Sequence, residues 1–551
     1  MNGLTMIVIS AIVLLAGYLF YGRYLAKKWG IDPDKKTPAY EFEDGIDYVP
    51  TKPSVVFGHE FASVAGAGPI TGPIIAAMFG WLPVLLWILI GGIFFGAVQD
   101  FAAMYASVKN KGKTIGYIIE LYIGKTGKNL FLIFVWLFSI LVVAAFADIV
   151  AGTFAGWTPK GDLSVANGAV ATTSTLFIFV SIALGFFIRR VKPSGLFSAI
   201  VAIIVLVVCI ALGLAFPMFI TKGMWLYIVF IYIFIASVTP VWALLQPRDY
   251  LNSFLLIAMI AAAFVGIVFT NPSINLPAFV GFTVNGLYLF PILFVTVACG
   301  AISGFHSLVA SGTSSKQVEN EKHMLPISYG AMIIECFLAV IALVAVGSLA
   351  IDGKLPSGTP PVIFASAIAG FLLKLGISET ISYTLITLAV SAFALTSLDS
   401  VSRVGRLAFQ EFFISEESKS PITKFFANKY IATIATLIFG YLLAIVGYQN
   451  IWPLFGSANQ LLAALALVAC AVFLKKTNRQ GAMLYAPMII MLAVTFTALF
   501  FTIKAKWLKL FSDSPFVFTS DGLQLVFAVL LLILGVMVAV SGIKKLKAKQ
   551  A

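Results

Sequence analysis

The sequence predicts an all-α integral membrane protein, and three observations support this prediction. Of its 551 residues, 60% are hydrophobic and only 11% are charged, whereas soluble domains carry about 25% charged residues. Apolar runs long enough to cross about 30 Å of hydrocarbon recur along the chain, for example at 6–25, 82–105 and 130–150. The basic residues stand in short clusters between these runs. A large soluble enzyme core is therefore excluded.

The net charge of +13 is interpreted as a signal of orientation, and no nucleic-acid partner is expected. Cytoplasmic loops of membrane proteins carry an excess of lysine and arginine. One basic cluster follows the first apolar run, at 23–28, and another forms the C-terminal tail, at 544–549. We therefore predict about 15 crossings, in a range of roughly 14 to 18, with the N-terminus outside and the C-terminus in the cytoplasm.

The chain is expected to divide into three parts. Residues 1–56 would hold one extra helix and an acidic cytoplasmic loop, residues 57–410 a transporter core, and residues 411–551 further C-terminal helices. Within the core, 57–215 and 220–410 are expected to be inverted repeats, because each contains an interrupted apolar helix. No loop is long enough for a folded extramembrane domain, so function is expected within the bilayer.

The first interruption is the most informative segment, with four glycines and two prolines between Gly58 and Pro73. Open backbone at bilayer depth is tolerated where it lines a cavity or is buried in protein. One interpretation is a loop that dips into the interface before a short helix. The other is a discontinuous helix whose free backbone groups bind substrate and ions. On the second interpretation the substrate-binding residues are Ser63, Gly66, Ala67, Gly68, Thr71 and Gly72.

A second interruption is predicted at 237–250, where two prolines stand in an apolar run. Paired interruptions in two antiparallel halves indicate an inverted-repeat transporter and its central site. The spacing is that of the LeuT-like arrangement of five plus five helices, with discontinuous helices and extra helices at both ends. Thr239, Trp242 and Gln246 are then expected to face the first interruption. A proline near a helix end would produce the same pattern by chance.

Ionisable and hydroxyl side chains in apolar segments provide the candidates for ion or proton coupling, because such groups are costly in lipid. These candidates are His59, Glu60, Asp100, Ser303, His306, Ser307, Ser311 and Asp399. The serines would face Ala65–Gly68 and bind a cation, or they would form a tight helix-packing face. His59 and His306 would form a proton relay.

Three further acidic residues need separate interpretations. Asp399 would pair with Arg403 or Arg406 at the interface, or would gate the inner mouth. Glu335 and Asp148 stand alone in apolar runs, and the sequence assigns them no role.

Enzyme motifs fail when they are checked. The zinc-protease pattern needs a histidine four residues after His59, and that place is held by Ser63. The phosphate-loop ending at 124–126 lacks its upstream glycine, because Ile119 occupies that position. We therefore expect no enzyme, no metal site and no cofactor beyond a coupling proton or sodium ion.

As a set, these motifs resemble the carbon starvation protein family, CstA. The resemblance is carried by the segments at 57–63, 66–70, 99–101, 245–251, 303–307 and 398–400. One departure is Glu60, where many relatives are expected to carry a second histidine. The resemblance implies uptake of peptides or pyruvate under carbon starvation, across the bacterial inner membrane. It also implies membership of the amino acid–polyamine–cation transporter superfamily.

The function expected from the sequence is therefore secondary active transport by a proton- or cation-coupled symporter. Half-helix N-termini near Gly68–Gly72 would present free N–H groups to a substrate carboxylate. The alternatives are an uncoupled channel or facilitator for a small carboxylate, and a membrane sensor subunit.

Overall fold

The computed structural model describes residues 1–45, 47–157, 161–191, 195–240, 244–413, 421–479, 481–512 and 515–547. Most of it is helical, and one small hairpin has β1 (Thr283–Val284) paired antiparallel with β2 (Leu287–Tyr288). The N-terminal helices are α1 (Gly3–Ala16), α2 (Arg23–Trp29), α3 (Pro38–Glu41), α4 (Pro53–Val64), α5 (Gly68–Ala76), α6 (Trp81–Gly91), α7 (Ala97–Lys109), α8 (Ile115–Tyr122), α9 (Lys125–Phe154), α10 (Val165–Val191), α11 (Gly195–Ala215), α12 (Lys222–Val238) and α13 (Leu245–Thr270).

The helices after the hairpin are α14 (Leu289–Thr296), α15 (Gly304–Gly312), α16 (Gly330–Leu349), α17 (Pro360–Leu373), α18 (Glu379–Phe413), α19 (Pro421–Phe426), α20 (Lys429–Ala444), α21 (Tyr448–Lys476), α22 (Ala482–Leu510) and α23 (Leu523–Lys547). Short π-helical or 3₁₀ turns adjoin several helices, at η1 (Gly17–Gly22), η2 (Ala77–Phe79), η3 (Gly92–Gly96), η4 (Ser314–Lys316), η5 (Glu321–His323), η6 (Leu325–Tyr329) and η7 (Phe518–Gly522).

Within the described residues, eleven helices are long and apolar enough to cross a membrane. The pair formed by α4 and α5 would be a twelfth span, and α12, α17 and α20 are shorter apolar helices. Large apolar side chains are exposed on the outer helices, as lipid contact requires. The count of about 15 crossings and the orientation of the termini stay predictions.

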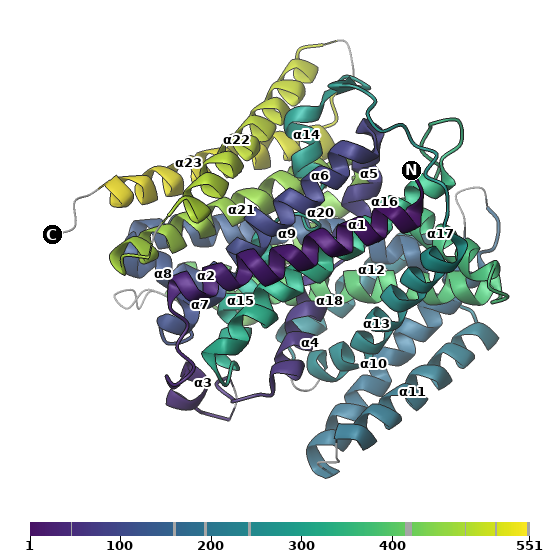
Figure 1. Cartoon of the computed structure of the whole chain (residues 1–551), viewed down its shortest axis with the longest axis horizontal. Coiled ribbons are helices and arrows are strands. Elements are labelled where there is room, and N and C mark those ends of the chain that lie inside the picture. The colour runs from purple at the N-terminus through teal and green to yellow at the C-terminus, as the bar shows by residue number, and fades with distance from the viewer. Residues whose placement is uncertain are drawn as a thin grey trace.

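The helices surround a central group made of α9, α18 and α21. The helices α9 and α18 pack along one another, and the most apolar part of α21 is completely buried. In Figure 1, α1 crosses the front of the bundle, α10, α11 and α13 lie at the lower right, and α22 and α23 lie at the upper left. The functional side chains are found where the broken helices reach this central group.

The first predicted break is present. Helix α4 ends at Val64 and α5 begins at Gly68, with a bend of 44° between them. Ala65 leaves the helical region at φ −73° and ψ 70°. Three N–H groups around the break still find acceptors: Ala65 donates to the Phe61 carbonyl, Gly66 to that of Val64, and Thr71 to that of Ala67. The segment is buried, which favours a discontinuous helix over a loop at the membrane surface.

The second predicted interruption is a connection between two helices. Helix α12 ends at Val238 and α13 begins at Leu245, and each is a separate apolar helix. The two prolines of this segment therefore mark a helix end and a helix start, where proline is well tolerated. Trp242 lies outside the described residues, and the side chain of Gln246 is also not described.

A second broken helix lies further along the chain, between α14 and α15. The helical path stops at Val297, with φ −86° and ψ 64°, and resumes after Ser303 in extended conformation. This break is not predicted from the sequence. After the first break come a long span (α6 with α7), a short helix (α8) and a second long helix (α9). After the second break come a long span (α16), a short helix (α17) and a second long helix (α18). The inverted repeats at 57–215 and 220–410 and the three-part division stay predictions.

Candidate functional site between the two broken helices

A small cavity lies where the two breaks face each other. Val64 and Gly66 line it from the first break, and Cys299 and Phe305 from the second. The remaining lining residues come from the central helices: Phe138, Val142 and Phe146 of α9, Ser397 of α18, and Phe455 and Asn459 of α21. The water-accessible volume is about 10 Å³, the space of about one water molecule. The helices that line the cavity would therefore have to move apart to admit any molecule larger than water.

Tertiary donors satisfy the carbonyl groups that the second break leaves open. The indole of Trp87 donates to the Val297 carbonyl at 3.2 Å, and the indole of Trp452 donates to that of Thr296 at 3.2 Å. The amide of Gln460 donates to the Phe294 carbonyl at 2.6 Å. These donors come from α6 and α21, so the break is held open by neighbouring helices.

Glycines allow the two breaks to approach closely. A Cβ atom added at Gly72 would stand 2.6 Å from the Thr296 carbonyl oxygen and 3.2 Å from the Val297 Cα. A Cβ atom added at Gly66 would stand 2.7 Å from the Ser397 hydroxyl. The first of these contacts is with backbone, which cannot rotate away as a side chain can.

Substituting Gly72 with alanine is therefore expected to reduce transport by about tenfold or more, because overpacking costs about 1–3 kcal/mol and misplaces the second break. Gly58→Ala is the matched control on the same broken span, since nothing lies within 4 Å of its added Cβ. Both variants are compared by uptake per inserted molecule and by thermal unfolding in detergent. Equal uptake by the two variants would show that close approach at Gly72 is unimportant.

Next to the cavity, three acidic side chains converge on one histidine. His306 follows the cavity residue Phe305 in α15, and its Nδ1 lies 2.9 Å from the Asp100 carboxylate. Its Nε2 lies 3.2 Å from the Glu335 carboxylate. Glu60 accepts a hydrogen bond from the Ser314 hydroxyl and interacts electrostatically with Asp100 and His306. We call Glu60, Asp100, His306 and Glu335 the acid–histidine cluster, and all four are buried.

Charge balance makes this cluster a candidate for proton binding. One imidazolium can balance only one carboxylate, and unbalanced buried charges are costly. In the described part of the chain, no Lys or Arg forms an ion pair with these four side chains. The cluster therefore approaches neutrality only when protons occupy the other acidic groups. The sequence placed three of its members in the coupling site but gave Glu335 no role.

The other predicted coupling residues make different contacts. The Ser307 hydroxyl donates to the Gly304 carbonyl, and the Ser311 hydroxyl donates to the Ser307 carbonyl. Ser303 bonds the Asn459 side chain. These bonds match the alternative of a helix-packing face, and no group of three metal-binding side chains was found among the described residues. The Nε2 atom of His59 has no hydrogen-bond partner in the same ranges, so the structure does not bring His59 into a hydrogen-bonded relay with His306.

Asp399 belongs to a separate buried ion-pair network. Its carboxylate accepts hydrogen bonds from Arg248 and from the Tyr232 hydroxyl, the latter at 2.7 Å. The expected pairing with Arg403 or Arg406 is wrong: Arg403 instead donates to the carbonyls of Ala236 and Thr239. Arg248 and Asp399 are each almost completely buried. The pair joins α13 to α18. On α18, Asp399 stands two residues after the cavity residue Ser397.

The remaining predicted substrate residues fall into two groups. Ser63, Ala67, Gly68 and Thr71 are buried at the first break beside Gly66 and Gly72. Thr239 lies at the end of α12, where its hydroxyl donates to the Ile235 carbonyl, and it is not a cavity-lining residue. Asn459 and Cys299 are cavity residues that the sequence analysis did not select. Asp148, also without an assigned role, pairs with Lys222 at 2.7 Å and accepts the Tyr448 N–H.

Comparisons with known proteins agree with this architecture. The Eremococcus coleocola manganese transporter in complex with an aromatic bis-isothiourea substituted compound superposes with a TM-score of 0.50 at 13% identity, covering 91% of this chain and 97% of that chain. This likeness shows the fold alone. It confirms the predicted class, an all-α membrane protein with a LeuT-like core, and leaves the repeat boundaries as predictions.

Sequence relatives are closer. The peptide transporter CstA of Escherichia coli is 33% identical, with 93% of this chain and 82% of the relative covered. The peptide transporter CstA of Bacillus subtilis is 32% identical, with 86% of each covered. The pyruvate/proton symporter BtsT of Escherichia coli is 32% identical, with 93% of this chain and 82% of the relative covered.

The fold, the two broken helices and the buried cavity define a multi-pass membrane transporter. The sequence matches the family described as carbon starvation protein CstA over residues 2–355 and 352–498. The chain belongs to that family.

Proposed function

We propose that the protein is a proton-coupled symporter that takes up a peptide or pyruvate through the cavity between its two broken helices. The observation that carries this proposal is His306, held between Asp100 and Glu335 on the half-helix whose first turn lines the cavity. The names of the relatives support it, since one is a pyruvate/proton symporter and others are peptide transporters.

Coupling follows from the position of α15. Phe305 lines the cavity and His306 belongs to the acid–histidine cluster. Any displacement of this half-helix therefore changes the surroundings of both residues together. The cluster includes groups from α4, α7 and α16. Rocking of these helices around the cavity would expose it to one side at a time, which is alternating access. Protons are then expected to enter and leave the cluster with each turn of the cycle.

The proposal places the protein in the bacterial inner membrane, with the N-terminus outside and the C-terminus in the cytoplasm. This orientation rests on the basic clusters at 23–28 and 544–549. In that orientation, uptake is driven by the inward proton gradient that respiring bacteria maintain.

The test is accumulation in proteoliposomes under imposed gradients. Radiolabelled pyruvate and a radiolabelled dipeptide are offered with an inward proton gradient or an inward sodium gradient, each with and without a protonophore. We expect accumulation above the external concentration of one substrate under the proton gradient, and its loss with the protonophore. Equilibration without accumulation would indicate the alternative, an uncoupled facilitator, and accumulation under sodium alone would overturn proton coupling.

A further inference from the structure

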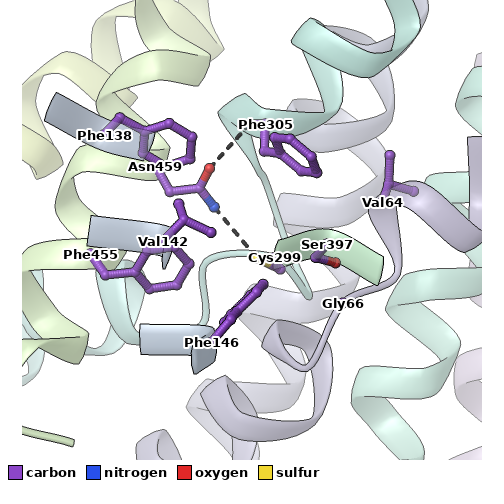
Figure 2. Close-up of a pocket in the computed structure, with 10 residues that line it drawn as sticks. All are labelled: Val64, Gly66, Phe138, Val142, Phe146, Cys299, Phe305, Ser397, Phe455 and Asn459. Atoms are coloured by element: carbon purple, nitrogen blue, oxygen red, sulfur yellow. Dashed lines mark hydrogen bonds between the residues drawn. The ribbon is translucent and has the colours of Figure 1, made fainter. Parts of the chain in front are cut away.

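Two carboxamide groups hold the second break. From α21, the Asn459 oxygen accepts the Phe305 N–H at 3.1 Å, and its nitrogen lies 3.4 Å from the Cys299 sulfur; Figure 2 shows both contacts at the cavity. From α7, the Gln99 nitrogen lies 2.9 Å from the Ser303 carbonyl oxygen. Gln99 is completely buried and does not line the cavity. Its carboxamide therefore reaches the break from outside the cavity wall.

The same Gln99 nitrogen contacts the acid–histidine cluster. It lies 3.0 Å from the Asp100 Oδ1. A backbone carbonyl and an ionised carboxylate can only accept hydrogen bonds, so the carboxamide presents its nitrogen to both. Its two hydrogens are then divided between them, one for Asp100 and one for Ser303. Gln99 is therefore a direct hydrogen-bonded link between the cluster and the second break.

This link restricts where Asp100 can hold a proton. Its other oxygen, Oδ2, lies 2.9 Å from the His306 Nδ1. Three further titratable groups act on Asp100 from neighbouring helices: Glu60 of α4, and Glu335 and Cys336 of α16. A proton on Oδ1 would point at the Gln99 N–H, which is a donor, whereas a proton on Oδ2 can be shared with the imidazole. With Gln99 in place, Asp100 therefore exchanges its proton on the side of His306.

Helix α7 is also pressed against the second break. A Cβ atom added at Gly96, three residues before Gln99, would overlap the Ala301 carbonyl oxygen. Ser303 stands in extended conformation immediately before α15, with φ −133° and ψ 125°. The cavity holds about one water molecule, so admitting a substrate displaces lining residues such as Phe305, which is two residues after Ser303. A displacement of Ser303 from α7 breaks the hydrogen bond to Gln99.

We propose that Gln99 is a positioning residue for proton coupling, which senses the position of the second break and sets which oxygen of Asp100 carries a proton. With the break packed against α7, the carboxamide reserves Oδ1 as an acceptor. When α15 moves away, the carboxamide can rotate and present its oxygen, so that either Asp100 oxygen can take a proton. Substrate movement at the cavity then changes proton binding at the cluster. This inference rests on the proposed proton symport and adds the residue that transmits the change.

The variant Gln99→Met tests this role, with Gln460→Met as the matched control. Gln460 is also completely buried and donates to the second break, at the Phe294 carbonyl; among the described residues it makes no hydrogen bond to the cluster. Each variant loses a donor to the break, so exchange of labelled for unlabelled substrate is expected to slow in both. The substrate is radiolabelled pyruvate or dipeptide, whichever the wild type accumulates. Under a proton gradient, the accumulation ratio of Gln99→Met alone is expected to fall about tenfold, the effect of one charge-assisted hydrogen bond.

A pH profile separates this role from simple packing. In Gln99→Met the missing N–H no longer favours the ionised carboxylate and leaves Oδ1 free for a proton. The midpoint of the pH dependence of exchange is therefore expected to move upward by about one pH unit, while Gln460→Met keeps the wild-type midpoint. In an Asp100→Asn background, adding Gln99→Met changes nothing further, because no carboxyl group is left to position. A wild-type midpoint in Gln99→Met, or the same shift in Gln460→Met, overturns the proposal.

A second measurement needs no transport. Infrared titration of the protein in detergent follows the carboxylic-acid C=O band that Asp100→Asn removes. We expect Gln99→Met to move the midpoint of this band upward by about one pH unit and Gln460→Met to leave it in place. An unmoved midpoint, or the absence of any such band, overturns the proposal. If Gln99→Met does not insert, Gln99→Asn replaces it, because this shorter carboxamide cannot reach both acceptors.

These outcomes are distinct from those that test the proposed function. If neither pyruvate nor the dipeptide accumulates under any gradient but the infrared midpoint moves, symport fails and the positioning of the Asp100 proton by Gln99 stands. If one substrate accumulates under the proton gradient and Gln99→Met accumulates it as the wild type does, symport stands and the role of Gln99 is wrong.

Discussion

Replacing Glu335 with glutamine is expected to abolish proton-driven accumulation of substrate while exchange of labelled for unlabelled substrate continues. Glu335 is completely buried on α16, with its carboxylate 3.2 Å from the His306 Nε2. Glutamine has nearly the same shape, but it carries no titratable proton. The variant therefore keeps the packing of the acid–histidine cluster and loses one proton-binding group.

The expected loss in the accumulation ratio is about tenfold or more, since each 1.4 kcal/mol of lost coupling corresponds to a factor of ten. Exchange needs only substrate movement, so its rate is expected to stay within about threefold of the wild type. The titratable groups that face His306 are Asp100, Glu60 and Glu335 itself. Removing one of the three should also flatten the pH dependence of uptake.

Glu120→Gln is the matched control, because it makes the same chemical change in a carboxyl group that pairs with Lys128 outside the cluster. Both variants are measured in proteoliposomes at equal protein density, first under a proton gradient and then in exchange at symmetrical pH. If Glu335→Gln accumulates substrate as the wild type does, Glu335 is not part of the coupling site. If exchange is lost as well, the residue acts on substrate movement rather than on coupling.

The first broken helix could be predicted from the sequence because its cause is local. Prolines at 69 and 73 and glycines at 66, 68 and 72 oppose a continuous helix whatever surrounds them. The second break has no comparable signal, with Gly300 the only glycine and no proline between Val297 and Ser303. It is held by donors from α6 and α21, which are far away in sequence. Pattern arguments cannot detect such tertiary donors.

The candidate site shows the same division. His306, Asp100 and Glu60 could be selected because ionisable groups in apolar runs are rare and costly. Glu335 was equally visible, but its role depends on a contact with His306 on another helix. For Asp399, sequence distance favours Arg403 or Arg406 as the partner, because no other guide to pairing is available in the sequence. The structure pairs it with Arg248, 151 residues away.

Removing one partner of the buried Arg248–Asp399 pair is expected to destabilise the protein more than any other single substitution considered. Both side chains are almost completely buried, and Asp399 also accepts the Tyr232 hydroxyl. Loss of Arg248 leaves the carboxylates of Asp399 and of the neighbouring Asp249, which lies 3.2 Å from Arg248, without their cation in a low-dielectric environment. Loss of Asp399 leaves Arg248 with Asp249 alone. Removing one partner of a buried pair costs about 3–5 kcal/mol. Asp399→Asn is therefore expected to lower the thermal unfolding temperature in detergent by many degrees, and Arg248→Met to do the same.

The pair Lys316–Asp47 provides the comparison, because the side chain of its aspartate is 65% exposed. An exposed charge is solvated in both the folded and the unfolded state, so Asp47→Asn should cost about 1 kcal/mol or less. The double variant Arg248→Met with Asp399→Leu removes this pair but leaves the Asp249 carboxylate without Arg248. It is therefore expected to recover part of the stability lost by Arg248→Met alone. If the double variant is as unstable as the sum of its parts, the two side chains do not interact, and the link between α13 and α18 beside the cavity depends on other contacts.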